Sequence, residues 1–106
     1  MHAVLIQFHS DLDGQKLMAT LPPNWMGDLL GTDGLVMKTY VGTSPNDIGG
    51  FYVFASAEAA TAYLESETWS VIANNAAVTN VVVQRFHVAD EPSIACGTPT
   101  ELKSGR

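Results

Sequence analysis

Residues 78–88 read Val-Thr-Asn-Val-Val-Val-Gln-Arg-Phe-His-Val, the longest stretch of the chain that predicts a single β-strand. Side chains alternate between the two faces of a strand. Val81 and Val83 therefore fall on one face, and Val82 and Phe86 on the other. Because both faces carry apolar residues, a sheet that contains this strand needs cover on both sides.

Three more segments, residues 2–9, 35–42 and 48–55, are rich in β-branched and aromatic residues and predict strands. The last two are separated by a short Thr-Ser-Pro-Asn-Asp stretch, which is typical of a turn, so they form a hairpin. Within the third segment, the Gly49-Gly50 pair predicts a bulge or another adjustment of the hairpin. It precedes a strand, so it is no phosphate-binding loop.

Helices are predicted between these strands. Residues 15–30 form a helix that Pro22-Pro23 interrupts, because proline lacks an amide donor and cannot continue a helix. Ser56 is a good N-cap for a helix that runs to about Glu65. We expect Thr68 to cap a further short helix.

The resulting order, β-α-β-β-α-β, is that of the α+β ferredoxin-like fold, a four-stranded antiparallel sheet with its helices on one face. The helices leave the second apolar face uncovered. Face-to-face pairing with a second copy would cover it and give a homodimer, a dimeric α+β barrel. Residues 1–93 form this single domain, and residues 94–106, rich in Gly, Thr, Ser and Lys, predict a loose C-terminal tail.

Composition argues against several classes of partner. The 106-residue chain has a net charge of −6 and only five Lys and Arg residues, whereas nucleic-acid binding needs clustered basic side chains. No apolar run approaches the roughly 20 residues of a membrane-spanning helix. The N-terminus does not resemble a signal peptide, and Cys96 is a single cysteine, so we expect a cytoplasmic protein and a spectator thiol.

Several stretches together resemble the YdhR-type monooxygenases of the dimeric α+β barrel group. They are Gln7-x-His9 with Asp13-Gly14, residues 33–38 (Asp-Gly-Leu-Val-Met-Lys), 49–54 (Gly-Gly-Phe-Tyr-Val-Phe), 62–65 (Ala-Tyr-Leu-Glu) and 86–93 (Phe-His-Val-Ala-Asp-Glu-Pro-Ser). The resemblance spans residues 4–93, including the proline interruption. The region around Trp25 departs from the pattern of the family, which bears on the choice of substrate.

This resemblance implies a small cofactor-independent monooxygenase that acts on an aromatic or polyketide-like molecule. Fold relatives also include cyclases, isomerases and lyases, so architecture alone does not select the reaction. Haem degradation is a further alternative, but no predicted helix contains a histidine to hold the iron. A non-catalytic dimer that binds a small ligand is the alternative from another class. We favour an enzyme.

Three polar residues are candidate catalytic groups. Gln7 and His9 share one face of the first strand, where His9 could act as a general base and Gln7 could orient the substrate. The structural alternative for His9 is a buried or interface histidine bonded to backbone. Arg85, expected on a central strand, could stabilise an enolate or carboxylate, or form an intersubunit salt bridge.

The substrate-binding candidates are Trp25, Trp69, Tyr63 and Asn24, most of which lie next to the predicted helix breaks. Aromatic walls with a few polar groups suit a planar organic ligand, although most such side chains belong to a core. We predict no metal site, because antiparallel pairing places His9 and His87 at opposite ends of the first and last strands. No cofactor-binding motif is present.

Overall fold

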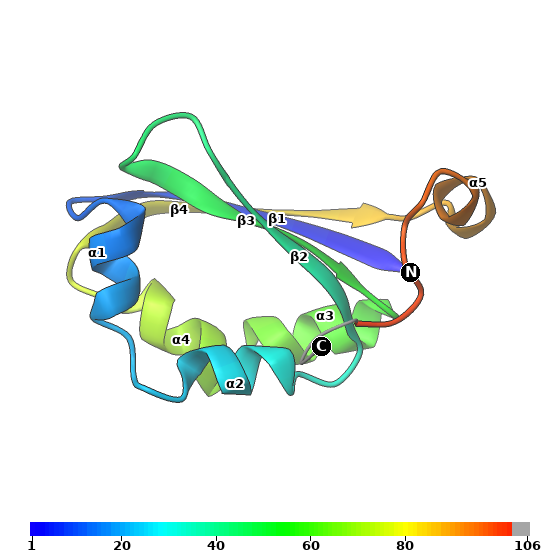
Figure 1. Cartoon of the computed structure of the whole chain (residues 1–106), viewed down its shortest axis with the longest axis horizontal. Coiled ribbons are helices and arrows are strands. Elements are labelled where there is room, and N and C mark those ends of the chain that lie inside the picture. Colours follow the sequence, from blue (N-terminus) through cyan, green and yellow to red (C-terminus); the bar gives the residue numbers. More distant parts are fainter. Residues whose placement is uncertain (103–106) are drawn as a thin grey trace.

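The computed structural model describes residues 1–102 and has the predicted ferredoxin-like architecture (Figure 1). Its sheet is antiparallel, in the order β2-β3-β1-β4. The strands are β1 (His2–Ser10), β2 (Leu35–Gly42), β3 (Asp47–Phe54) and β4 (Val78–His87). The helices are α1 (Gly14–Ala19), α2 (Trp25–Leu30), α3 (Ala57–Leu64), α4 (Glu67–Ala73) and α5 (Asp90–Ala95).

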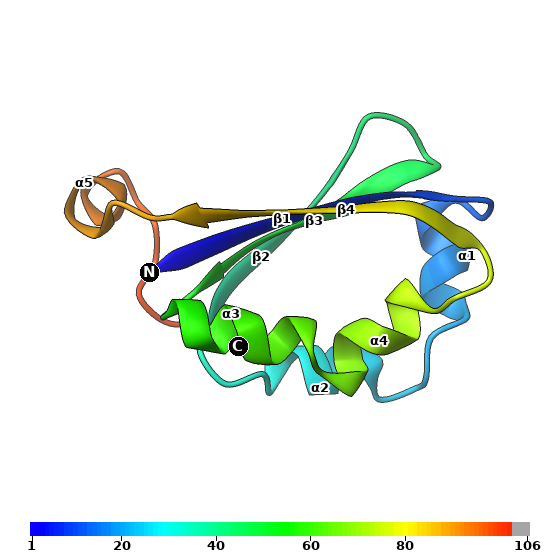
Figure 2. The same cartoon turned by 180° about the vertical axis from the view of Figure 1, so that it is seen from behind.

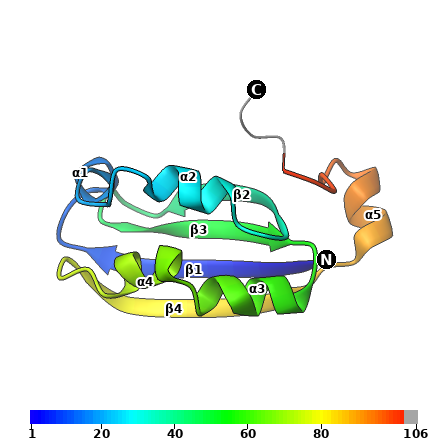
Figure 3. The same cartoon turned by 90° about the horizontal axis from the view of Figure 1, so that it is seen from below.

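Each long connection contains two short helices rather than one, and α1 to α4 cover the same face of the sheet (Figure 2). Seen from the helix side, α1 and α2 lie over β2 and β3, whereas α3 and α4 lie over β1 and β4 (Figure 3). The break between α1 and α2 falls at Pro22-Pro23, as predicted. None of the helices in residues 1–102 is long and apolar enough to cross a membrane.

Side-chain caps begin the helices that follow β3. Ser56 accepts a hydrogen bond from the Ala59 amide and caps α3, as predicted. The expected cap at Thr68 is wrong, because Ser66 accepts from the Trp69 amide and starts α4 at Glu67. Serine caps a helix at least as well as threonine, and Ser66 comes two residues before Thr68. The helix α4 therefore begins earlier than predicted.

The Gly49-Gly50 pair is not a bulge. Both glycines pair in unbroken register with β1, Gly49 opposite Gln7 and Gly50 opposite Ile6. A Cβ atom on Gly49 would lie 1.8 Å from the Ile6 carbonyl oxygen. The pair is therefore needed for close approach of the two strands, and the prediction of a hairpin adjustment was wrong.

The bulges lie elsewhere. The register between β1 and β4 shifts between Gln7 and His9, where β4 holds an extra residue and Asn80 has a φ of 55°. The register between β2 and β3 shifts between Leu35 and Met37. Leu35 thus packs in the core under the helices, whereas Val36 belongs to the cluster on the opposite face.

The main core lies between the sheet and the helices. Its fully buried members include Val4, Ile6, Phe54, Tyr52 and Tyr63. The opposite face also carries apolar side chains, as predicted. Ala3, Val36 and Val53 form a small cluster there, and Val82 and Phe86 are 53% and 44% exposed. No helix of residues 1–102 covers this face (Figure 1).

The predicted boundary between the domain and the loose tail, after residue 93, falls inside a helix. Residues 90–95 form α5, beyond the end of the sheet (Figure 1). Pro92 lies in the first turn of this helix, where its missing amide donor removes no intrahelical hydrogen bond. Farther along, Leu102 packs against the main core. Residues 103–106 of the predicted tail lie outside the described residues.

Candidate active site

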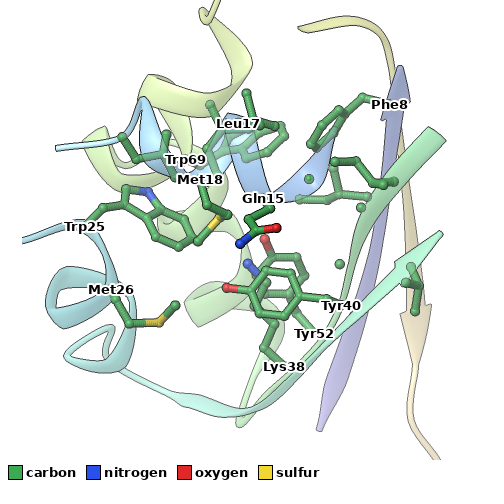
Figure 4. Close-up of a pocket in the computed structure, with 18 residues that line it drawn as sticks. Phe8, Gln15, Leu17, Met18, Trp25, Met26, Lys38, Tyr40, Tyr52 and Trp69 are labelled. Atoms are coloured by element: carbon green, nitrogen blue, oxygen red, sulfur yellow. The ribbon is translucent and has the colours of Figure 1, made fainter. Parts of the chain in front are cut away.

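A cavity of about 330 Å³ lies between the helices and the sheet (Figure 4). Its lining is overwhelmingly apolar and comes from α1, α2, α4 and the first three strands. The helices contribute Gln15, Leu17, Met18, Trp25, Met26, Trp69 and Ile72, and the strands contribute Ile6, Phe8, Lys38, Tyr40, Val41, Ile48, Gly49, Gly50 and Tyr52. This size and lining are typical of sites for small organic molecules.

Two glycines, Gly49 and Gly50, belong to the lining of the cavity. A Cβ atom on Gly50 would lie 2.9 Å from Lys38 Cε and 2.9 Å from the Tyr52 ring. Glycine at this position therefore allows Lys38 and Tyr52 to take their places in the wall. The double glycine thus serves both the close approach of β3 to β1 and the shape of the cavity.

Lys38 carries the only charged group among the lining side chains of residues 1–102. Its Nζ atom lies 4.3 Å from the ring centre of Tyr40, 4.7 Å from that of Tyr52 and 5.0 Å from that of Trp25. Within residues 1–102, no carboxylate forms an ion pair with it. Burial lowers the pKa of Lys38 from 10.5 to about 7, because the cavity solvates an ammonium poorly.

The phenols around Lys38 remain protonated at neutral pH. The hydroxyls of Tyr52 and Tyr63 are hydrogen-bonded at 3.1 Å inside the core. Burial raises the pKa of Tyr52 far above its usual range and raises the pKa of Tyr63 to about 12. Burial also raises the pKa of Tyr40, although this side chain is partly exposed at the cavity edge. These phenols can donate hydrogen bonds but cannot accept a proton as a base.

Two of the four substrate-binding candidates line the cavity. Trp25 from α2 and Trp69 from α4 both belong to its helix-side wall (Figure 4). The Trp25 indole nitrogen donates a 2.8 Å hydrogen bond to the Thr68 carbonyl, which ties the two helices together. Tyr63 does not line the cavity but contacts the lining residue Tyr52, through a hydroxyl hydrogen bond and through ring packing with centroids 5.1 Å apart. Asn24 precedes α2 as an exposed residue outside the lining.

Gln7 and His9 do not line this cavity. They share one face of β1, as predicted, but it is the face away from the helices, where they border a shallow polar depression. His9 Nδ1 lies 2.9 Å from a carboxylate oxygen of Asp47, whose other oxygen accepts a 2.8 Å hydrogen bond from Ser44. The hydrogen bond with His9 lowers the pKa of Asp47. The catalytic roles of Gln7 and His9 stay predictions.

Arg85 does not occupy a central strand. The sheet order makes β4 an edge strand and Arg85 is exposed, so the expectation of a central strand was wrong. It donates hydrogen bonds to His2 Nε2 at 3.0 Å and to the Ala57 carbonyl at 2.9 Å. Arg85 lies outside the cavity lining, and its role in substrate binding or in a contact between subunits stays a prediction.

The histidines lie as the antiparallel pairing predicted. His87 is opposite His2, whereas His9 is opposite Thr79 at the other end of the strand pair. Within residues 1–102, no group of three or more His, Cys, Asp or Glu side chains comes close enough together to hold a metal ion.

Lys38 was missed at the level of sequence, although a signal was present. It is a single basic residue in an otherwise apolar or neutral strand, and Tyr40 lies two positions away on the same face. Simple alternation also places the apolar Val36 on that face, so the sequence does not show whether the face of Lys38 points to the helices or away from them. The bulge after Leu35 resolves it, since Val36 turns away and Lys38 points into the cavity.

Comparisons with known proteins agree with this fold. The family described as "Putative mono-oxygenase ydhR" matches residues 4–97. A solved structure of a protein of unknown function from Nitrosomonas europaea aligns with a TM-score of 0.59 at 16% identity, covering 83% of this chain and 88% of that one. A "putative antibiotic biosynthesis monooxygenase" from Deinococcus radiodurans aligns with a TM-score of 0.60 at 10% identity, covering 85% and 94%. No curated protein matches the chain.

Proposed function

Since the chain belongs to the YdhR mono-oxygenase family, we propose that its cavity binds a planar aromatic or polyketide-like molecule and that the protein oxygenates it without a cofactor. The observation that carries this proposal is the partly open aromatic cavity with a single amine among the described residues of its wall. A flat, apolar molecule with one acidic phenol or enol complements such a lining, because rings stack on the tryptophans and the acidic group meets the amine.

The proposed chemistry needs no external reductant. An activated CH₂ group reacts with O₂ to give a C=O group and water, so one oxygen atom enters the product and the other leaves with both hydrogens. The substrate itself supplies the electrons that reduce O₂, once it has lost a proton. The protein would bind the planar anion, stabilise its charge and keep bulk water away from the reacting carbon.

The same cavity also supports a second reaction class. An amine that accepts a proton inside an apolar site can promote isomerisation, cyclisation or lyase chemistry without oxygen. A non-catalytic ligand-binding protein would use the same walls and form no product. These alternatives differ in their need for O₂ and in turnover, so one assay separates all three.

That assay measures oxygen consumption and product formation with anthrone, in air and under argon. We expect turnover in air only, with label from isotopic O₂ in the new carbonyl group. Turnover under argon would favour an isomerase, cyclase or lyase. Binding without product would favour a non-catalytic ligand-binding protein.

Two variants on one helix test whether the cavity is the site. Met26 lines the cavity and Leu30 does not, yet both belong to α2 and are 40% exposed. Met26→Trp should narrow the cavity and reduce turnover, whereas Leu30→Trp should not. Equal activity of the two variants would place the reaction elsewhere.

We also propose that a second copy of the chain covers the open face of the sheet. The support is the row of apolar side chains there, including Val82 and Phe86, which are exposed in the isolated chain. Light scattering should give the mass of a dimer. Val82→Lys should yield a monomer, whereas Leu30→Lys on the helix side should leave the dimer intact. A monomeric wild-type protein would contradict this assembly.

A further inference from the structure

Lys38 is half-buried among aromatic rings, and no carboxylate of residues 1–102 gives it the counter-ion that a buried ammonium normally has. Its neighbours in the cavity are neutral on every side. From α1 comes Gln15, from α2 Trp25, and from the strands Tyr40 and Tyr52. Among the described lining residues, the amine is therefore the one group that could pair with a negatively charged ligand atom as a cation (Figure 4).

Two opposing effects act on the protonation of this amine. Ring faces attract the ammonium form, by roughly 0.5–1 kcal/mol for each exposed cation–π contact. Burial in an apolar wall disfavours the same form and prevails in lowering the pKa of Lys38. An amine in such surroundings exists partly as the free base near neutral pH, and an incoming anion would stabilise its protonated form.

We propose that Lys38 is the catalytic base of this cavity: its neutral amine takes a proton from a phenol, enol or activated C–H group of the ligand, and the ammonium then pairs with the resulting anion. The O–H or C–H bond of the ligand breaks, an N–H bond forms, and the electron pair stays on the ligand. No oxidant takes part in this step. The inference rests on the proposed function, because it assigns the proton transfer that must precede reaction with O₂.

The other groups near the cavity are less suited to this step. The phenols of Tyr40 and Tyr52 are held protonated by burial, so they can only donate hydrogen bonds to the developing oxyanion. His9, the base predicted from the sequence, lies on the opposite face of the sheet and is engaged with Asp47. Gln15 does not titrate. Among the titratable side chains of residues 1–102, only Lys38 combines access to the cavity with a free-base form.

The assignment predicts a class of ligand. The molecule should be planar and carry an acidic O–H or C–H group at one edge, within reach of the amine. A methyl ether of the same phenol lacks the proton and should bind without forming an ion pair. A permanently cationic ligand has no proton to give to the amine and cannot form the ion pair, so it should gain nothing from Lys38.

The test uses para-nitrophenol, whose anion is yellow, at a pH below its own pKa. Wild-type protein should turn the probe yellow on binding. Lys38→Met should weaken phenolate binding about tenfold or more. The matched control is Lys16→Met, since Lys16 is an exposed lysine outside the cavity lining. A yellow complex of equal affinity in Lys38→Met would overturn the inference, as would colourless binding to the wild type.

A second variant separates proton transfer from charge pairing. Arginine keeps a positive charge but does not give up its proton, so Lys38→Arg should still bind phenolate and should fail to turn anthrone over. Turnover by Lys38→Arg at the wild-type rate would overturn the role as base. The proposed oxygenation can fail while the role of Lys38 stands. That result would be wild-type protein that binds the phenolate through Lys38 but consumes no oxygen with anthrone.

Discussion

Lys38→Met should make the protein more stable, because methionine keeps most of the apolar stem and removes the charge that burial penalises. A general expectation for a surface lysine is that its loss changes stability little. A large stabilisation would therefore be specific evidence that the buried amine lowers the free energy of unfolding of the wild-type protein. A loss of stability of this kind is typical of functional sites.

The magnitude follows from the surroundings of the amine. Burial lowers the pKa of Lys38 from 10.5 to about 7. At roughly 1.4 kcal/mol for each pKa unit, the protonated amine costs the folded state at most about 5 kcal/mol. The three ring faces offset on the order of 2 kcal/mol of this, and solvent contact screens a further part. We therefore expect a gain of about 2 kcal/mol in the free energy of unfolding at about pH 6.

The gain must depend on pH in one direction. In the unfolded chain the amine has its ordinary pKa of 10.5, so between about 7 and 10.5 the unfolded state binds more protons than the folded state. Wild-type stability thus rises with pH across this window, whereas Lys38→Met lacks this contribution. The advantage of the variant should shrink by about 1–2 kcal/mol between about pH 6 and about pH 10.5, because the penalty disappears only when the unfolded amine also loses its proton.

Urea unfolding followed by circular dichroism, at both pH values, measures these differences. Lys16→Met serves as the control for removal of a lysine and should match the wild type at each pH. The reasoning is refuted if Lys38→Met is less stable than the wild type at the lower pH, or if its advantage does not change with pH.

The remaining predictions concern the sheet, the core phenols and alkaline pH. Gly49→Ala should destabilise the fold by about 3 kcal/mol or more, because its Cβ atom would collide with the Ile6 carbonyl. Gly27→Ala, in an exposed helix with no atom near the new Cβ, should instead stabilise it by about 0.5–1 kcal/mol. Urea unfolding compares both, and equal effects would contradict the close approach. Tyr63→Phe should cost about 1–2 kcal/mol by leaving the Tyr52 hydroxyl unpaired, and an unchanged urea midpoint would contradict this. Raised phenol pKa values also mean that wild-type stability falls above about pH 10, where unfolded tyrosines ionise first. In an absorbance titration, Tyr52 and Tyr63 should ionise only when the protein unfolds. Ionisation of either phenol near pH 10 in the folded protein would contradict this prediction.

Much of the fold could be predicted because its signals are local. The bounds of β2 match the predicted residues 35–42, since β-branched residues and flanking turn residues delimit the strand. The double proline ends α1, and Ser56 caps α3, through effects that act within a few residues. The element order then leaves few topologies, of which the ferredoxin-like one is observed.

The candidate site was harder to predict, because residues far apart in the chain define it. Trp25 and Trp69 could be proposed from their places beside helix breaks. Lys38 could not, since a bulge two residues earlier decides which face of β2 it occupies. Gln7 and His9 were placed on a common face correctly, but local alternation does not say which face the helices cover.

By itself, the sequence determined the strands, the interrupted helices, their order and the presence of apolar residues on both faces of the sheet. These follow from periodicity, turn chemistry and capping, which depend on neighbours along the chain. Only the tertiary structure decided that Arg85 lies at a sheet edge, that Gly49 allows two strands to approach, and that Lys38 enters an aromatic cavity. Strand order, register and helix placement produce these environments, and each joins segments that are distant in sequence.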